Sequence, residues 1–116
     1  MKFSVSLKEN YAFRRLYAKG KSAASPLLVV YFRRNGSTGN RLGLTVSTKV
    51  GKAVERNRVR RRLREIYRLN EDKLLPGYDI VIVARVRSKT VSYRELEEHF
   101  LSLCTRLGLM RPEEEQ

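Results

Sequence analysis

The sequence is poor in the residue types that build disulfides, metal sites and membrane spans. Its 116 residues include one cysteine, Cys104, and one histidine, His99. A single cysteine excludes an internal disulfide and fits a reducing compartment. No apolar run approaches the ~18 residues of a membrane span, and the N-terminus lacks the apolar stretch of a signal peptide. We therefore expect a cytoplasmic protein with one domain over residues 1–116.

Groupings typical of catalytic and metal sites are also missing. His99 and Cys104 fall about 140° apart around an expected helix, so they cannot chelate one ion together. No base lies at helical spacing to activate Cys104 as a nucleophile. Residues 20–22 (GKS) resemble the end of a P-loop, but Arg15 stands where that motif needs its first glycine. We expect neither a metal site nor a catalytic group in the chain itself.

One sign of charge dominates the chain. Lysine and arginine together number 25 against 12 acidic residues, for a net charge of +13. Residues 1–69 carry 18 basic and 3 acidic side chains, whereas residues 70–116 carry 7 and 9. A compact fold tolerates such self-repulsion where a polyanion is the partner. The first two thirds of the chain are therefore expected to bind nucleic acid, with an anionic membrane surface as the second candidate.

The charge is densest in residues 49–68 (KVGKAVERNRVRRRLREIYR). A helix turns about 100° per residue, so this segment places an arginine-rich stripe beside an apolar stripe with the spacing of a core-packing face. Arginine outnumbers lysine 17 to 8 in the chain, and guanidinium groups bind phosphate bidentately and stack on bases. The sequence thus favours RNA as the polyanion. The polar stripe is Asn57, Arg60, Arg61, Arg64 and Arg68, and the apolar stripe is Val59, Leu63, Ile66 and Tyr67.

The first third of the chain predicts a helix followed by strands. Ser6 and Glu9 have the spacing of a capping box, so a helix is expected over residues 7–19. It should end at Gly20 in the left-handed conformation. Its apolar and aromatic stripe fits a core face, but exposed rings there and at Tyr31 would stack on single-stranded bases. The aromatic candidates are Phe13, Tyr17 and Tyr31.

Three strands are expected next. A short edge strand is predicted within residues 21–26, and residues 27–33 alternate as a clear strand. Turn residues at 35–40 predict that the strand at 41–47 pairs with the previous one as a hairpin.

The second half predicts a buried strand and a last helix. Residues 78–84 (YDIVIVA) are too continuously apolar for an exposed strand, so they should lie inside the sheet. Ser92 and Glu95 form a second capping box before a helix that ends at Gly108. Residues 110–116 are expected to be a frayed tail. The strand, helix, strand unit over residues 41–84 should join parallel strands. The elements then predict an α+β sandwich of α-β-β-β-α-β-α order, with helices on a mixed four-stranded sheet.

Residues 52–61 (KAVERNRVRR) resemble the arginine-asparagine-arginine signature of the bacterial ribonuclease P protein component. The likeness covers nearly the whole chain, including residues 7–10 (LKEN), Leu42-Gly43 and residues 78–80 (YDI). It implies a small accessory to a catalytic RNA that cuts the 5′ leader from precursor tRNA, with Mg²⁺ held chiefly by RNA and substrate. It also implies a left-handed crossover around the signature helix. We expect no obligate protein partner.

The resemblance further implies two sets of site residues. A cleft between the first helix and the sheet would hold the single-stranded leader, and the signature helix would face the RNA subunit. The leader set is Phe13, Tyr17, Tyr31, Ser47 and Lys49. The RNA-subunit set is Lys52, Arg56, Asn57, Arg58, Arg60, Arg61, Arg64 and Arg68.

Two other functions stay open at this point. Charge alone also fits a general binder of structured RNA, such as a ribosomal protein, which would be indifferent to a leader. A nuclease that needs no RNA subunit is disfavoured, because the sequence assembles no nucleophile, base and oxyanion site. Membrane binding ranks last, since the apolar face of the basic helix is expected to be used by the core.

Overall fold

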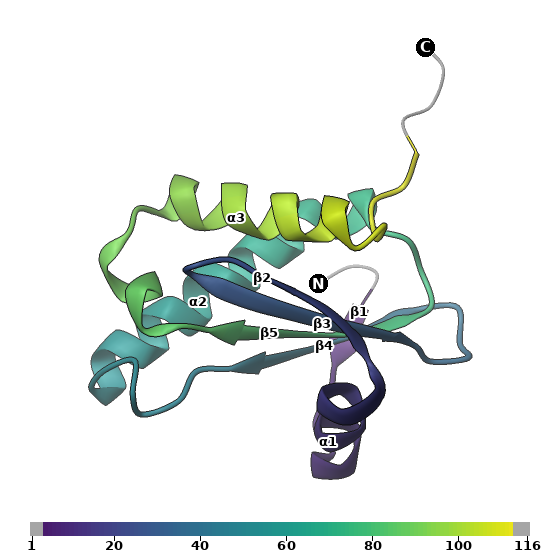
Figure 1. Cartoon of the computed structure of the whole chain (residues 1–116), viewed down its shortest axis with the longest axis horizontal. Helices are drawn as coiled ribbons and strands as arrows, with labels where there is room; N and C mark the ends of the chain where they lie inside the picture. The colour runs from purple at the N-terminus through teal and green to yellow at the C-terminus, as the bar shows by residue number, and fades with distance from the viewer. Residues whose placement is uncertain (1–3, 113–116) are drawn as a thin grey trace.

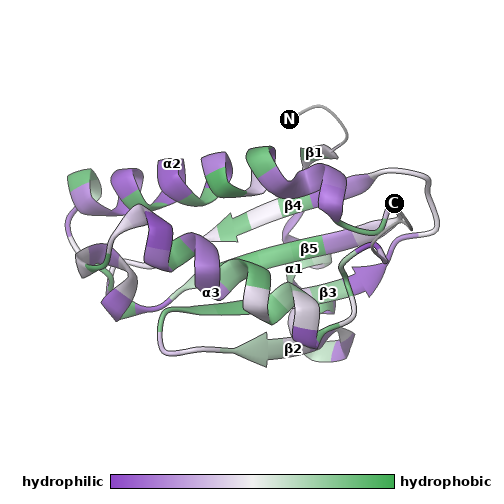
Figure 2. Cartoon of the chain, turned by 90° about the horizontal axis from the view of Figure 1, so that it is seen from above, coloured by the Kyte–Doolittle hydropathy of each residue, from purple (hydrophilic) through white to green (hydrophobic). Residues whose placement is uncertain are grey.

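Helices cover both faces of a five-stranded sheet in the computed structural model of the chain, which describes residues 4–112. Two helices, α2 and α3, lie on one face, and α1 lies on the other (Figures 1 and 2). The strands follow the order β1-β4-β5-β3-β2 across the sheet. The elements are β1 (Ser4–Ser6), α1 (Asn10–Lys19), β2 (Lys21–Ala24), β3 (Leu28–Arg34), β4 (Asn40–Thr45), α2 (Ala53–Asn70), β5 (Tyr78–Ala84) and α3 (Tyr93–Arg106), with 3₁₀ turns at Glu71–Lys73 and Val86–Thr90.

The two helices on the main core behave as their sequences predict. The expected apolar stripe of α2 is almost completely buried, from Val59 at 1% exposure to Tyr67 at 0%. At the start of α3, the Ser92 hydroxyl accepts a hydrogen bond from the Glu95 amide at 3.1 Å, which confirms Ser92 as the N-cap, the serine half of the expected capping box. Gly108 has a φ of 73° after α3, the left-handed conformation expected there.

The strand at β5 occupies the centre of the sheet, as its continuous apolar run predicts. It pairs antiparallel with β3 and parallel with β4. The expected hairpin between β3 and β4 is therefore wrong, because β5 lies between these two strands. Ile80, Val81 and Ile82 are fully buried, so both faces of β5 are covered, and an inner position with two neighbours satisfies its backbone as well.

The N-terminal segment differs from its prediction. Residues Ser4–Ser6 form β1, a fifth strand that pairs parallel with β4. Because Ser6 lies in this strand, it does not cap α1, which begins at Asn10 without a side-chain cap. Gly20 is extended, with φ −77°, and not left-handed. Glycine is required there because a Cβ would lie 2.6 Å from the carbonyl oxygen of Leu16.

The segment after α3 is more ordered than expected. Leu109 is fully buried, and Met110 forms a β-bridge with Leu74. The Arg111 amide donates to the Lys73 carbonyl at 2.7 Å. A frayed tail is therefore wrong for residues 110–111, and residues 113–116 lie outside the described part of the chain.

A small second core attaches α1 to the sheet. Ala12 and Leu16 of α1 pack with Leu7 and with Val81 of β5, on the face opposite α2 and α3. The ring of Phe13 lies over Gly43 of β4, so close that a Cβ on Gly43 would come within 2.5 Å of it. Because glycine has no side chain at position 43, the Phe13 ring and the helix α1 that carries it can lie close to the sheet.

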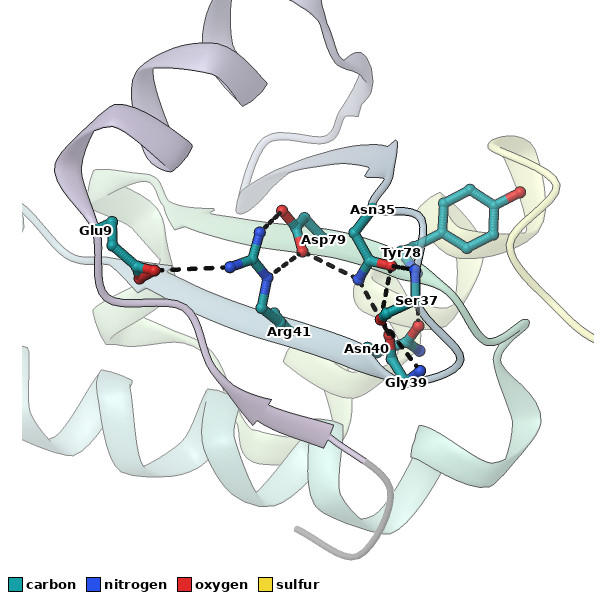
Figure 3. A network of polar contacts seen from close by, with 8 residues as sticks. All are labelled: Glu9, Asn35, Ser37, Gly39, Asn40, Arg41, Tyr78 and Asp79. Carbon is teal, nitrogen blue, oxygen red and sulfur yellow. Dashed lines mark hydrogen bonds and ion pairs between the residues drawn. The ribbon is translucent and has the colours of Figure 1, made fainter.

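A polar network ties the strands to α1 at one end of the sheet (Figure 3). Arg41 of β4 donates two hydrogen bonds to Asp79 of β5, at 2.7 and 2.6 Å, and lies 3.7 Å from Glu9. Asn35, in the turn between β3 and β4, donates to the same Asp79 carboxylate at 3.2 Å. The bond to Asp79, more than any other contact, raises the pKa of Arg41. Asp79 is only 8% exposed, so its charge depends on these partners.

We predict that Asp79→Ala lowers the free energy of unfolding by about 2–4 kcal/mol, because it leaves the half-buried Arg41 and the Asn35 amide without their shared acceptor. Glu98→Ala is the matched control, since it removes the partner of Arg94 in a pair whose side chains are 88% and 64% exposed. That change should cost less than about 0.5 kcal/mol. Urea unfolding of the three proteins measures both values, and equal losses would contradict the prediction.

Gly43→Ala should displace the Phe13 ring and cost about 1–3 kcal/mol of unfolding free energy, the usual cost of overpacking. In a Phe13→Leu background the same change should cost clearly less, because the smaller side chain makes room. The double-mutant cycle is measured by urea unfolding, and an unchanged cost of Gly43→Ala in the second background would exclude contact with Phe13 as the cause.

Candidate RNA-binding surfaces

The outward side of α2 forms the first candidate surface, which we call the arginine face. The expected polar stripe does lie on one side of the helix, opposite the buried stripe. The side chains are exposed except those of Arg56 and Arg60, which are half-buried. The arginine face comprises Asn57, Arg58, Arg60, Arg61, Arg64 and Arg68, with Lys52 and Arg56 at its start.

The guanidinium groups of α2 are not equivalent. Arg68 donates to both carboxylate oxygens of Glu65, at 2.9 and 2.7 Å, which raises the pKa of Arg68 and lowers the pKa of Glu65. Arg62, which lies outside the predicted site, donates to the carbonyl of Val91 at 3.0 Å. These two arginines therefore have part of their hydrogen-bonding capacity occupied within the protein.

The other arginines make weaker contacts or none. Arg56 donates to the Gly51 carbonyl at 3.2 Å, Arg58 to the Lys89 carbonyl at 3.4 Å, and Arg60 to the Asn57 side chain at 3.2 Å. Within residues 4–112, neither Arg61 nor Arg64 has a side-chain hydrogen bond or an ion pair. These two guanidinium groups are thus the most available to phosphate.

The second candidate surface is a cluster of three rings on the opposite face of the sheet, which we call the aromatic cluster. Tyr17 of α1 meets Phe13 of the same helix at 6.4 Å and Tyr31 of β3 at 5.0 Å between ring centroids. The Tyr17 hydroxyl also bonds to the Thr45 hydroxyl of β4 at 2.7 Å. Tyr17 is 41% exposed, so this ring presents open surface to a ligand.

Ser47 and Lys49 lie in the segment between β4, which contacts the aromatic cluster through Thr45, and α2, which carries the arginine face. Both are exposed, in the turn that joins β4 to α2, where the Val50 amide donates to the Ser47 carbonyl at 3.0 Å. The turn leads to Lys52, whose amide donates to the Glu55 carboxylate at 2.9 Å. This bond caps α2 and, together with nearby Lys89, lowers the pKa of Glu55.

A hollow of about 150 Å³ lies between the two candidate surfaces. Its lining includes Phe13 of the aromatic cluster and Arg60 and Arg64 of the arginine face. The arginine face and the aromatic cluster therefore adjoin each other, which the sequence patterns did not indicate. Thr45 is a further residue that sequence reasoning missed, although its alternation with Gly43 on β4 places it on the same face.

The described residues offer little for chemistry of their own. Burial raises the pKa of the Cys104 thiol to about 12, so it is not a nucleophile at neutral pH. Across residues 4–112, no group of three or more His, Cys, Asp or Glu side chains is arranged to hold a metal ion. In the same range no helix is both long and apolar enough to cross a membrane.

Comparison with known proteins gives one consistent result. The family model described as Ribonuclease P matches residues 1–108. The ribonuclease P protein component of Alkaliphilus oremlandii is 47% identical over 110 residues, covering 95% of this chain and 96% of that protein. The protein component of Clostridioides difficile is 48% identical over 104 residues, covering 89% and 91%.

Solved structures agree with this assignment. The RNase P protein of Staphylococcus aureus superposes with a TM-score of 0.84 at 30% identity, covering 94% of this chain and 98% of that one. The RNase P protein of Thermotoga maritima has a TM-score of 0.80 at 35% identity, covering 87% and 96%. The sequence identity, the coverage and the shared fold together show that this chain belongs to the ribonuclease P protein family.

Proposed function

We propose that this protein is the RNA-binding subunit of ribonuclease P and assists a catalytic RNA in removing the 5′ leader from precursor tRNA. Family membership supports the general role. The observation that carries the proposal further is the pair of adjoining surfaces, an arginine face suited to phosphates and an aromatic cluster suited to unstacked bases. A protein with these two surfaces can hold the RNA subunit and a single-stranded leader at the same time.

The arginine face is assigned to the RNA subunit. Its free guanidinium groups, Arg61 and Arg64, should contribute most, because no internal bond has to break before they bind phosphate. Rigid presentation on α2 favours binding further, since the buried stripe fixes the helix on the sheet. The full set is Lys52, Arg56, Asn57, Arg58, Arg60, Arg61, Arg64 and Arg68.

The aromatic cluster is assigned to the leader, with Phe13, Tyr17 and Tyr31 stacking on bases. Ser47 and Lys49 would contact the same strand near the start of α2. The hollow beside Phe13 brings Arg60 and Arg64 within reach of that strand. We therefore assign these two arginines a position where the leader and the RNA subunit meet.

Catalysis is assigned to the RNA. Mg²⁺ would be held mainly by the RNA subunit and the substrate, because the donor groups of the described residues do not fit a resident metal ion. The protein would contribute positive charge near the phosphates, which reduces the Mg²⁺ concentration needed to neutralise them.

Reconstitution with a bacterial ribonuclease P RNA tests the proposal. At low Mg²⁺ the protein should raise leader cleavage well above that of the RNA alone. Phe13→Ala with Tyr31→Ala should weaken precursor binding by about 1–3 kcal/mol per lost stack and leave binding of mature tRNA unchanged. Tyr11→Ala is the control, because Tyr11 is an aromatic residue of α1 with 55% exposure that lies outside the aromatic cluster.

Two results would count against this function. Absence of any stimulation at low Mg²⁺ would exclude a ribonuclease P subunit. Equal effects of the cluster variant on precursor and mature tRNA would favour a general structured-RNA binder.

The unequal engagement of the arginines gives a second prediction. Arg61→Gln should weaken binding to the RNA subunit more than Arg68→Gln, because the Arg68 charge is already paired with Glu65. Losing one phosphate contact should also lower the slope of log K against log salt by ~0.7–0.9. Filter-binding titrations at several salt concentrations compare the two variants, and a larger loss for Arg68→Gln would refute the ranking.

A further inference from the structure

A second basic and aromatic site lies at the β2 edge of the sheet, away from the arginine face. A pocket of about 370 Å³ opens where the end of α1 passes into β2, beside the end of α3. Its walls combine cationic and aromatic side chains, and none of its lining residues is acidic. The main lining residues are Lys19, Lys21, Phe32, Arg34, Tyr78 and Leu107.

In the described part of the chain, the cations of this edge pocket have no acidic partner. Lys19, Lys21 and Arg34 form no ion pair within residues 4–112. Four other basic residues of the protein do form ion pairs there, namely Arg41, Arg68, Lys89 and Arg94. Unneutralised like charges gathered around one hollow repel each other. An anionic ligand removes that repulsion.

Two rings lie at the pocket, Phe32, which is only 8% exposed and belongs to the main core, and Tyr78, which is half-buried against that core. Phe32 and Tyr78 meet at 5.2 Å between centroids, and the Arg34 guanidinium lies 5.6 Å from the centre of the Tyr78 ring. Unpaired bases stack on the planar guanidinium groups of arginine and on the faces of aromatic rings. The pocket therefore offers stacking and phosphate contacts in one place.

The pocket and the aromatic cluster are also built on neighbouring residues of the paired strands β2 and β3. Ser22 pairs with Tyr31, and the preceding residue Lys21 pairs with Phe32. Consecutive residues of a strand face opposite sides of the sheet, so the cluster and the pocket lie on opposite faces, offset by one residue. The strand between them, β2, is the outermost strand of the sheet. A flexible strand of RNA can thus pass from Tyr31 around this edge to Lys21.

We propose that the edge pocket binds single-stranded RNA, namely the part of the leader that continues beyond the aromatic cluster. One base stacks on the guanidinium of Arg34, which Tyr78 supports from below, while Lys21 and Lys19 contact the neighbouring phosphates. This inference rests on the proposed function, because the ligand is the same strand that the cluster holds.

Precursor tRNAs with leaders of different length separate the two sites. Affinity for the reconstituted protein and RNA complex is measured with a leader of about 5 nucleotides and one of about 15 nucleotides, within and beyond the reach of one small binding site. The test variant is Lys21→Gln with Arg34→Gln, both exposed. The control is Lys73→Gln with Arg111→Gln, which removes the same charges from exposed positions outside the pocket that also form no ion pair within residues 4–112.

The test variant should bind the long-leader substrate about 5- to 10-fold more weakly, with a salt slope lower by ~1.4 for two lost phosphates, and bind the short-leader substrate normally. The control should change neither affinity. The edge site would be refuted if the test and control variants had the same affinities for both substrates. It would also be refuted if the test variant lost the same affinity for the short-leader and the long-leader substrate. Failure of the proposed function gives a different result from failure of the edge site. If the aromatic cluster did not bind the leader, Phe13→Ala with Tyr31→Ala would leave the affinity for the short-leader substrate unchanged.

Discussion

The parallel pairing of β4 with β5 is the contact on which the rest of the structure depends. The bidentate bond between Arg41 and Asp79 fastens this pair at one end. Since α2 is the connection between the two strands, their pairing determines where the arginine face lies. It also separates β3 from β4 by a full strand, about 9.5 Å from axis to axis. Tyr17 spans that separation, with its ring against Tyr31 and its hydroxyl on Thr45.

Some basic side chains of the protein form ion pairs with its own carboxylates, and others are exposed without such a partner in the described chain. Arg41 and Arg68 are engaged by carboxylates, whereas Arg61, Arg64 and the edge-pocket cations have no such partner in the described chain. If RNA is the ligand, the self-repulsion of the free protein becomes part of the binding free energy, because phosphates relieve it on assembly.

Sequence periodicity predicted the elements whose determinants are local. The stripe of α2 and the Ser92 cap of α3 depend on spacing within one segment, and both expectations were confirmed. Strand pairing was predicted less well, because the turn residues at 35–40 describe only the reversal of the chain. They carry no information on whether a later strand will insert. The strand, helix, strand order over residues 41–84 did predict the parallel relation of β4 and β5, and the apolar run of β5 indicated an inner strand. Neither pattern indicated that β3 would be the other neighbour of β5.

The errors at the N-terminus have the same origin. Ser6 and Glu9 have capping spacing, yet β4 offers an open edge to Ser6, and the Glu9 carboxylate lies near Arg41. Both preferences come from partners more than thirty residues away in the sequence. The arginine candidates were likewise found by composition, but spacing could not distinguish Arg68, which is paired with Glu65, from Arg61, which has no partner among residues 4–112. Only the conformations of the side chains separate them.

The separate small core beneath α1 has a consequence for dynamics. This helix is held by Ala12 and Leu16 against Leu7 and Val81, while α2 and α3 share the much larger core on the other face. Local opening of α1 therefore exposes far less apolar area than global unfolding and needs less free energy. Amide hydrogens of α1 should exchange with solvent through such openings before those of β5, and the wall that carries Phe13 and Tyr17 can yield to admit a strand while the sheet beneath it stays intact.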